Sequence, residues 1–248
     1  MNRYFLETSY IGTNYAGFQI QKNAISIQFE IEKALEVLLR RKISLTGSSR
    51  TDAGVHALQN YFHFDYSELI SNDIVYNINA ILPNDIVVNN LLAVKPESHC
   101  RFDAVARLYA YHIYRFKNPF LADRAYYYPY EVDIQGMQAA AELLYGYTDY
   151  TAFSKRRTQV QTYECSVFES SWKIEKEEMI YTVKANRFLR GMVRGLVGTM
   201  LHIGRGKMQL DQFRKIIEDK NSSLVDFSAP AKGLFLEEVI FAENYFDR

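Results

Sequence analysis

The stretch GSSRTDAGVHA, from Gly47 to Ala57, separates two predicted strands, at 43–46 and 61–65, and so sets where the first sheet of the fold turns. An arginine, a threonine and an aspartate sit among its small residues, and no helical or strand period explains them. Gly54 can adopt a positive φ without steric strain, which allows a tight turn. Asp52 would then lie at the tip of a loop on a rigid sheet, where catalytic groups are common. The alternative is an Asx turn, in which the Asp52 side chain bonds the backbone near Gly54.

Strands outnumber helices on both sides of this turn. Hydrophobic patterning predicts strands at 3–9, 43–46, 61–65, 87–94, 104–116 and 234–241, with a hairpin across 168–183. Periodic apolar residues predict a helix capped by Ser26, one from Asp133 to 144, and others at 72–81, 187–203 and 211–219. Because the strands do not alternate strictly with the helices, the expected fold class is α+β with largely antiparallel sheets.

The order of these elements suggests an internal duplication of topology. Strand, helix, strand, strand, helix, strand occurs once before residue 100 and again after it, which predicts two ferredoxin-like (RRM-like) halves. We expect an N-terminal α+β half at 1–103 and a C-terminal α+β half at 104–248. No glycine- or serine-rich linker separates them, so we expect the halves to share a continuous sheet or an interface.

Composition narrows the class of protein. The chain has 29 basic and 29 acidic side chains, so it lacks the overall basic field that marks many nucleic-acid-binding proteins. No apolar run is long enough to span a membrane and the N-terminus lacks a signal peptide, which predicts a cytoplasmic protein. Cys100, Cys165 and the five histidines show no metal-ligand spacing, and no phosphate loop or nucleophilic serine motif is present. We therefore expect no metal and no cofactor, and both cysteines buried and reduced.

Three arginines interrupt an apolar stretch near residue 190. Arg187, Arg190 and Arg194 are spaced i, i+3, i+7, so a helix would place them on one face. Arg194 lies well inside the apolar stretch, and a buried arginine needs a carboxylate partner. The alternative is a solvated basic face without a partner.

The predicted strand 104–116 carries three tyrosines, Tyr109, Tyr111 and Tyr114. Tyrosines two residues apart on one face of a strand usually pack in the core or against a neighbouring strand. Such tyrosines can also form a platform on which bases stack.

The segment RTDAGVHA, at 50–57, resembles the signature of the tRNA pseudouridine synthase A family. Other segments resemble further motifs of the family in the same order along the whole chain, namely YIGTNYAGFQIQ (10–21), SHCRF (98–102), ARLYAY (106–111), DYTAF (149–153), FLRGMVR (188–194) and APAKGL (229–234). The chain departs from the family pattern at Ile11, Phe18, Ser49 and Leu108, none of which is the presumed nucleophile.

The resemblance implies an isomerase that converts uridine to pseudouridine at positions 38, 39 and 40 of the tRNA anticodon stem-loop. It also implies a homodimer, and two α+β halves that share a largely antiparallel sheet with the active-site cleft between them. No cofactor is implied. This agrees with the chemistry, because uracil is detached from C1′, turned and reattached through C5 without a net gain of atoms or electrons.

The resemblance also assigns roles to the candidate residues. Asp52 is the nucleophile, which attacks C1′ or C6 or assists the formation of a glycal, and Arg194 keeps its carboxylate ionised. Arg50 fills the space that the flipped base leaves, and Tyr109 stacks on that base. Contacts to the substrate are expected from basic side chains, namely Arg187, Arg190, Arg205, Lys207, Lys155, Arg156 and Arg157. These residues predict a local basic cleft, balanced by acidic surface elsewhere.

Two other functions stay open on the residues alone. A non-catalytic RNA-binding module would use its sheets and tyrosines for binding and would keep its affinity after the substitution Asp52→Asn. A carboxylate glycosidase generally needs a pair of carboxylates, and the sequence offers one strong candidate.

Overall fold

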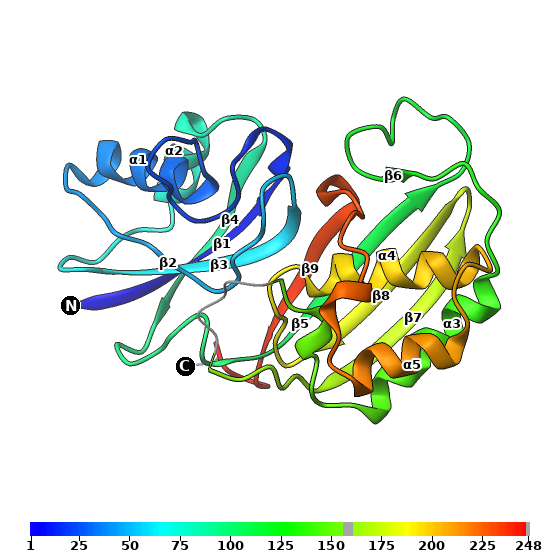
Figure 1. The fold of residues 1–248 in the computed structure, drawn as a ribbon. Helices are drawn as coiled ribbons and strands as arrows, with labels where there is room; N and C mark the ends of the chain where they lie inside the picture. The colour runs from blue at the N-terminus through cyan, green and yellow to red at the C-terminus, as the bar shows by residue number, and fades with distance from the viewer. Residues whose placement is uncertain (156–160, 247–248) are drawn as a thin grey trace. The chain divides into compact units, whose positions relative to one another are not determined.

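The computed structural model describes residues 1–155 and 161–246 and has a mixed α+β architecture with mostly antiparallel strands (Figure 1). The chain divides into two compact units: unit 1 is Met1–Val105 with Phe235–Arg248, and unit 2 is Ala106–Leu234. The predicted α+β class is confirmed, whereas the ferredoxin-like character of each half stays a prediction. The C-terminal segment groups with unit 1, although the sequence-based division placed all of 104–248 in the second half.

Unit 1 is built on a sheet with the strand order β4-β1-β3-β9. Its elements are β1 (Asn2–Tyr10), the 3-10 helix η1 (Gly12–Asn14), α1 (Ile27–Leu39), β2 (Thr46–Gly47), β3 (His56–Tyr66), α2 (Ile74–Ile81), β4 (Ile86–Val94) and β9 (Leu234–Phe241). Strand β1 is antiparallel to both β3 and β4, whereas β9 runs parallel to β3. Helices α1 and α2 lie together over one face of the sheet (Figure 1).

Unit 2 is built on three antiparallel strands in the order β5-β8-β7. Its strands and α-helices are β5 (Ala104–Tyr114), β6 (Tyr126–Tyr127), α3 (Ile134–Leu143), β7 (Val167–Glu175), β8 (Glu178–Ala185), α4 (Met192–Gly204) and α5 (Leu210–Glu218). Its 3-10 helices are η2 (Leu144–Gly146), η3 (Thr151–Phe153), η4 (Ser222–Leu224) and η5 (Ala231–Gly233). The predicted hairpin is confirmed as β7 and β8, and its turn contains Lys176 with a φ of 54°.

The predicted N-caps at Ser26 and Asp133 are confirmed. The Oγ of Ser26 accepts a hydrogen bond of 3.2 Å from Phe29 N at the start of α1. The Oδ1 of Asp133 accepts from Gln135 N at 3.0 Å and from Gly136 N at 3.1 Å at the start of α3. Each cap satisfies main-chain donors that the first turn of a helix leaves unpaired.

The helix predicted to begin at Arg187 begins at Met192 instead. Gly191 precedes it with a φ of 75°, a left-handed conformation that the interior of a right-handed helix does not contain. Arg187 and Arg190 therefore lie in the irregular segment before α4, and of the three arginines Arg194 alone is helical. The prediction of one helical face that carries all three is wrong.

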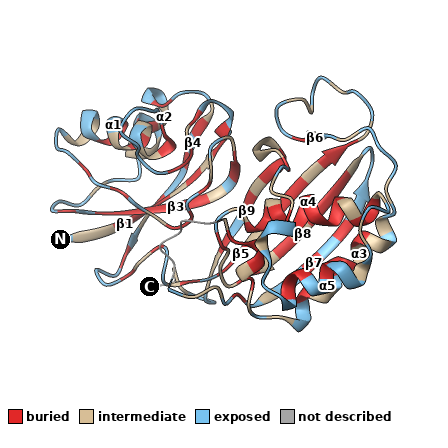
Figure 2. Ribbon diagram, in the orientation of Figure 1, coloured by how far each residue is buried: buried red, intermediate tan, exposed pale blue. Residues whose placement is uncertain are grey.

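Buried residues lie along the strands and on the inner sides of the helices in each unit (Figure 2). Tyr111 and Tyr114 of β5 are buried, which favours packing over an exposed platform for bases. Cys100 and Cys165 are free thiols and are both buried, as predicted. No helix within the described ranges has the length and apolar character needed to cross a bilayer.

Candidate active site

Asp52 lies in a tight turn between β2 and β3. The main chain closes this turn, because Val55 N donates a hydrogen bond of 3.1 Å to the carbonyl oxygen of Asp52. Gly54 has a φ of 78°, in the region that favours glycine. The Asp52 side chain is partly exposed and makes no hydrogen bond or ion pair with any residue that the structure describes. The Asx turn is therefore not formed, and the carboxylate stays available for chemistry.

A buried network holds the residues on both sides of Arg50. Asn60 Nδ2 donates to the carbonyl of Ser49 at 3.0 Å and to the hydroxyl of Tyr10 at 3.1 Å. Burial raises the pKa of Tyr10 to about 12, so its phenol stays protonated, and its oxygen shares a hydrogen bond of 2.8 Å with Thr51 Oγ1. The loop is thus fixed before and after Arg50. The Arg50 side chain itself is exposed and has no hydrogen-bond or ion-pair partner in the described part of the chain.

Two glycines in the loop after β1 pack against the Asp52 turn. Gly17 has a φ of 98°, and a Cβ on it would lie 2.9 Å from the carbonyl oxygen of Thr51. A Cβ on Gly12 would overlap the carbonyl of Val55. Both positions therefore need a residue without a side chain. In the sequence these glycines indicated only a loop, so their role in supporting the Asp52 turn was not predicted.

His56, the histidine of the RTDAGVHA segment, is buried. Its Nδ1 accepts a hydrogen bond of 3.1 Å from Gly12 N, which places the proton of a neutral ring on Nε2. Its ring lies 4.5 Å from that of Phe235. These contacts give His56 a packing role in joining the turn to the first loop.

Tyr109 lies in β5, directly opposite Val183 of β8. Its side chain is buried, and its ring meets that of Phe188 edge to face, with centroids 4.9 Å apart and an interplanar angle of 78°. Phe188 comes from the irregular segment before α4. The packing orients the Tyr109 ring within unit 2.

Arg194 lies in the first turn of α4 and is partly exposed. Its Nε donates a hydrogen bond of 2.6 Å to the carbonyl of Ala229, while its two terminal nitrogens make no hydrogen bond or ion pair within residues 1–155 and 161–246. Tyr111 holds the same loop, because its hydroxyl donates to Pro230 O at 2.7 Å and its ring packs on Gly233. Tyr111 is a positioning residue that the sequence did not identify.

The remaining predicted contacts are basic side chains of unit 2. Arg187 is partly exposed and Arg190 is exposed. Lys155 lies beside Arg190, since its main-chain N donates to Arg190 O at 3.0 Å and its aliphatic stem covers Gly191. Arg156 and Arg157 lie outside the described residues. The structure thus places Asp52 and Arg50 in unit 1, and the other predicted site residues, Tyr109, Arg187, Arg190 and Arg194, in unit 2.

His63, His99 and Cys100 have the arrangement closest to a metal site in the described part of the chain, with ligand atoms within 4.8 Å of one another. These atoms already have partners. His63 Nδ1 lies 3.2 Å from Cys100 Sγ, and His99 Nδ1 accepts from Arg101 N at 3.1 Å. Burial lowers the pKa of both imidazoles, to about 4 for His63. Core packing accounts for the cluster.

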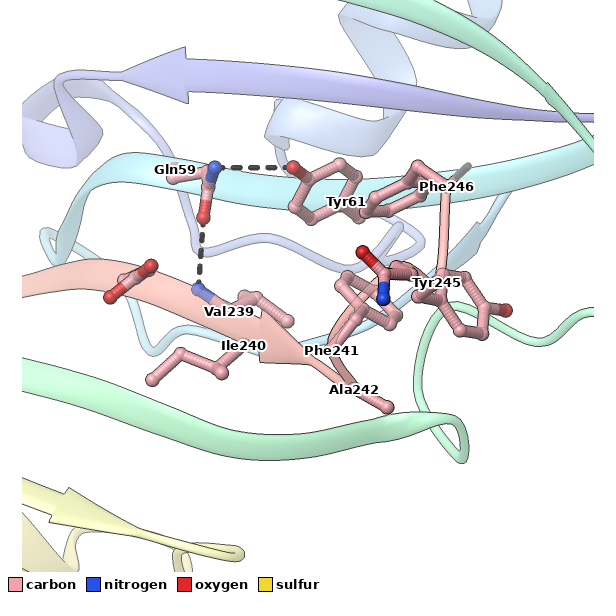
Figure 3. A pocket seen from close by; sticks show the side chains of 10 residues that line it. Gln59, Tyr61, Val239, Ile240, Phe241, Ala242, Tyr245 and Phe246 are labelled. Carbon is pink, nitrogen blue, oxygen red and sulfur yellow. Dashed lines mark hydrogen bonds between the residues drawn. The ribbon is translucent and has the colours of Figure 1, made fainter. Parts of the chain in front are cut away.

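A hollow of about 290 Å³ lies beside the end of β9 in unit 1 (Figure 3). Gln59 crosses it, donating to Tyr61 OH at 3.1 Å and accepting from Val239 N at 3.1 Å. Burial, then the charges of Glu7 and Glu238, raise the pKa of Tyr61. An acidic, aromatic lining of this kind repels phosphate, and none of the predicted site residues contributes to it, so we do not assign the substrate to this hollow.

Comparison with known proteins points to one family. The sequence model of tRNA pseudouridine synthase matches residues 140–242. A tRNA pseudouridine synthase A of Bacteroides fragilis is 44% identical over 250 residues, which cover 100% of this chain and 99% of the relative. The enzyme of that name from Parabacteroides distasonis is 41% identical over 99% of this chain and 98% of its own length. The one from Staphylococcus aureus is 36% identical over 98% and 92%.

Proposed function

The chain belongs to the tRNA pseudouridine synthase A family, and we propose that it isomerises uridine to pseudouridine at positions 38, 39 and 40 of the tRNA anticodon stem-loop, with Asp52 as the nucleophile. The observation that carries the proposal is the state of Asp52. Its turn is held by the main chain and by a buried network on either side of Arg50, while its carboxylate engages no described residue. A fixed backbone with an unengaged carboxylate suits a nucleophile.

The reaction replaces one bond of the nucleoside with another. The bond from C1′ to N1 of uracil breaks, and a bond from C1′ to C5 forms. C5 loses a proton and N1 gains one, so atoms and electrons balance without a co-reactant. Asp52 acts by attacking C1′ or C6, or by assisting the formation of a glycal, and each route needs an ionised carboxylate.

We assign to Arg194 the role of keeping Asp52 ionised once substrate is bound. When the bound nucleobase excludes water from a carboxylate, the neutral form of the carboxylate is favoured, and a nearby guanidinium opposes this effect. The bond from Arg194 Nε to Ala229 O supports the assignment, because it fixes the plane of the guanidinium and leaves both terminal nitrogens for another acceptor. Arginine can present such a pair of donors to one carboxylate, whereas lysine cannot.

A uridine in a paired stem must leave the base stack before it can react. Extrusion costs a few kcal/mol, and stacking of the flipped base returns roughly 1–3 kcal/mol. We propose that the Tyr109 ring, oriented by Phe188, supplies this stacking, and that the exposed Arg50 fills the vacated space. Arg187 and Arg190 are proposed to contact the RNA, where their charges offset those of phosphates.

We further propose that the protein acts in the cytoplasm as a homodimer, as its resemblance to the family implies. A chain of zero net charge can still hold RNA if basic residues gather locally. Arg190, Lys155 and Gly191 lie together in unit 2, where the small glycine lets the lysine stem pass. This arrangement supports a local basic surface on that unit.

The experiment that tests the function follows the proton lost from C5. A tRNA transcript labelled with tritium at C5 of its uridines should release tritium into water with the wild-type protein. Asp52→Asn should release none while it still binds the transcript, and Asp52→Glu should be much slower, because a displaced nucleophile reacts poorly. A wild-type protein that binds tRNA without releasing tritium would contradict the proposal and favour a binding module. Release of free uracil would indicate a glycosidase.

A further inference from the structure

Three tyrosines in unit 2 have no part in the proposed catalytic step. Tyr126, Tyr128 and Tyr130 occupy every second position from the start of β6 onward, and each ring contacts the next. Their ring centroids are 5.3 Å apart between the first two and 5.0 Å apart between the last two. Tyr130 is 48% exposed, and the other two are partly exposed. We call these three residues the tyrosine row.

Arg205 ends the tyrosine row. It is the C-terminal cap of α4, and its guanidinium lies over the ring of Tyr130 at 4.0 Å from the centroid. It makes no ion pair or side-chain hydrogen bond with any other residue in the described ranges. Its charge and N–H groups therefore stay open to a ligand. A guanidinium that rests on an aromatic ring can stack on a base with its other face or bind a phosphate at its edge.

A small hollow of about 90 Å³ adjoins the tyrosine row. Tyr126 and Tyr128 line one part of it, and His202 and Asp226 line another, with 3.0 Å between His202 Nε2 and Asp226 Oδ2. Because pockets for whole ligands are about 300–1,000 Å³, this hollow admits the edge of a base and not a complete nucleoside. The Asp226 carboxylate in this hollow repels a phosphate. A phosphate would therefore bind at the other end of the row, beside Arg205.

We propose that the tyrosine row and Arg205 bind an unpaired nucleotide of the RNA substrate, with its base stacked on the tyrosines and its phosphate at Arg205. This inference rests on the proposed function. Aromatic rings beside an open cation form the combination that proteins use for single-stranded nucleic acid. This substrate contact is separate from that of the flipped uridine.

The length of α4 sets where this nucleotide lies along the RNA. Arg205 follows Arg194 by 11 residues, which is about 16 Å along the helix axis. Stacked bases follow one another at about 3.4 Å along a strand. A stacked strand therefore crosses this distance in about five nucleotides, so one short RNA segment that joins paired and unpaired bases can supply both the nucleotide on the row and a uridine that reacts near Arg194. A stem-loop meets this requirement, because its unpaired bases lie close to paired ones, whereas a continuous duplex does not.

The variants Tyr130→Leu and Arg205→Gln test the proposal. For each we expect the Kd for an unmodified tRNA transcript to rise about 10-fold, through loss of stacking or of a phosphate contact. The single-turnover rate at saturating enzyme should stay within about twofold of wild type, because neither residue touches the reacting uridine. Arg205→Gln should also reduce the slope of log affinity against log salt by about 0.7–0.9, the effect of one phosphate contact. Arg205→Lys should keep the salt slope.

Two exposed residues serve as matched controls. Tyr76→Leu removes an 80% exposed tyrosine from α2, and Arg214→Gln removes an arginine from α5 that pairs with Asp211 at 3.9 Å. Both should bind tRNA as the wild type does. Melting curves for all variants identify any that fail to fold. The milder variant Tyr130→Phe keeps the aromatic ring and should bind tRNA as the wild type does.

A second substrate separates this proposal from the proposed function. The second substrate is a stem-loop whose loop bases are replaced by an abasic linker. The wild type should bind it only as tightly as Tyr130→Leu binds the unaltered stem-loop. Tyr130→Leu should bind both RNAs with the same affinity. The proposal would be overturned if Tyr130→Leu and Arg205→Gln both bound the tRNA transcript as tightly as the wild type does. It would also be overturned if these variants lost as much affinity for a fully paired duplex as for the stem-loop. A protein that isomerises no uridine but shows the predicted losses on the stem-loop would retain the nucleotide site and lose the catalytic function.

Discussion

Gly17→Ala tests how the fold presents Asp52 without touching the carboxylate. Gly17 has a φ of 98°, and a Cβ there would lie 2.9 Å from Thr51 O and 3.2 Å from Ala53 N. A non-glycine residue at positive φ is strained by about 1–2 kcal/mol, and relief of the two contacts moves the turn by several tenths of an ångström. We expect the free energy of unfolding to fall by about 2–3 kcal/mol. For a chain of this size the melting temperature should fall by about 5–10 °C.

The effect on catalysis should exceed the effect on binding. A displacement of 1 Å at a reacting group can lower a rate by about 100-fold, so the smaller shift expected here should lower the single-turnover rate about 10-fold. The Kd for tRNA should stay within about twofold of wild type, because Gly17 is buried against the turn and offers no surface to RNA. Both quantities can be measured with the tritium-release substrate at saturating and limiting enzyme.

Two other glycines provide matched controls. A Cβ on Gly146 would have no atom within 4 Å, and its φ is not positive, so Gly146→Ala should change neither melting nor rate. Gly206 has a φ of 67° with open space around it, so the melting curve of Gly206→Ala isolates the backbone strain. A Gly17→Ala enzyme that reacts within about twofold of wild type would refute the idea that this packing positions Asp52.

Other changes have equally specific outcomes. Ser49→Ala should raise the free energy of unfolding in urea by up to about 1 kcal/mol, because the buried Ser49 Oγ has no hydrogen-bond partner among the described residues; a loss of stability would reveal a hidden partner. A hydrogen bond from Lys220 lowers the pKa of Asp149 to about 2, so its stabilisation is present above the unfolded value of about 4 and is lost as pH falls toward 2. Asp149→Asn should therefore melt slightly below wild type at pH 7, and the gap should close in acid; a constant gap would contradict this. Arg194→Lys, which cannot keep both the bond to Ala229 and a paired contact to a carboxylate, should slow isomerisation about 100-fold at unchanged tRNA affinity; full activity would remove Arg194 from the site.

Local signals in the sequence predicted much of the fold. Ser26 and Asp133 were identified as caps because the cap residue and the helix that it serves are neighbours in the chain. The start of α4 was misplaced because the apolar pattern continues through 188–193, while the left-handed Gly191 that delays the helix has no periodic signature. Strand β6 has two residues, too few for an alternating pattern, and was not predicted.

The candidate site shows the same division between local and long-range information. Asp52 and Gly54 could be placed in a turn from their own segment, and the structure confirms the turn. The support from Gly12, Gly17 and Asn60 depends on contacts between segments far apart in the chain, which the spacing of residues does not encode. The chemical roles came from the family resemblance and stay predictions until they are measured.

The measurement that tests the central claim most directly is carbodiimide mapping of pseudouridine on unmodified tRNA transcripts incubated with the wild-type protein or with Asp52→Asn. New signals at positions 38, 39 and 40 with the wild type, and none with a folded, tRNA-binding Asp52→Asn, are the predicted result. Equal signals from both proteins, or none from a wild-type protein that binds the transcript, would contradict it.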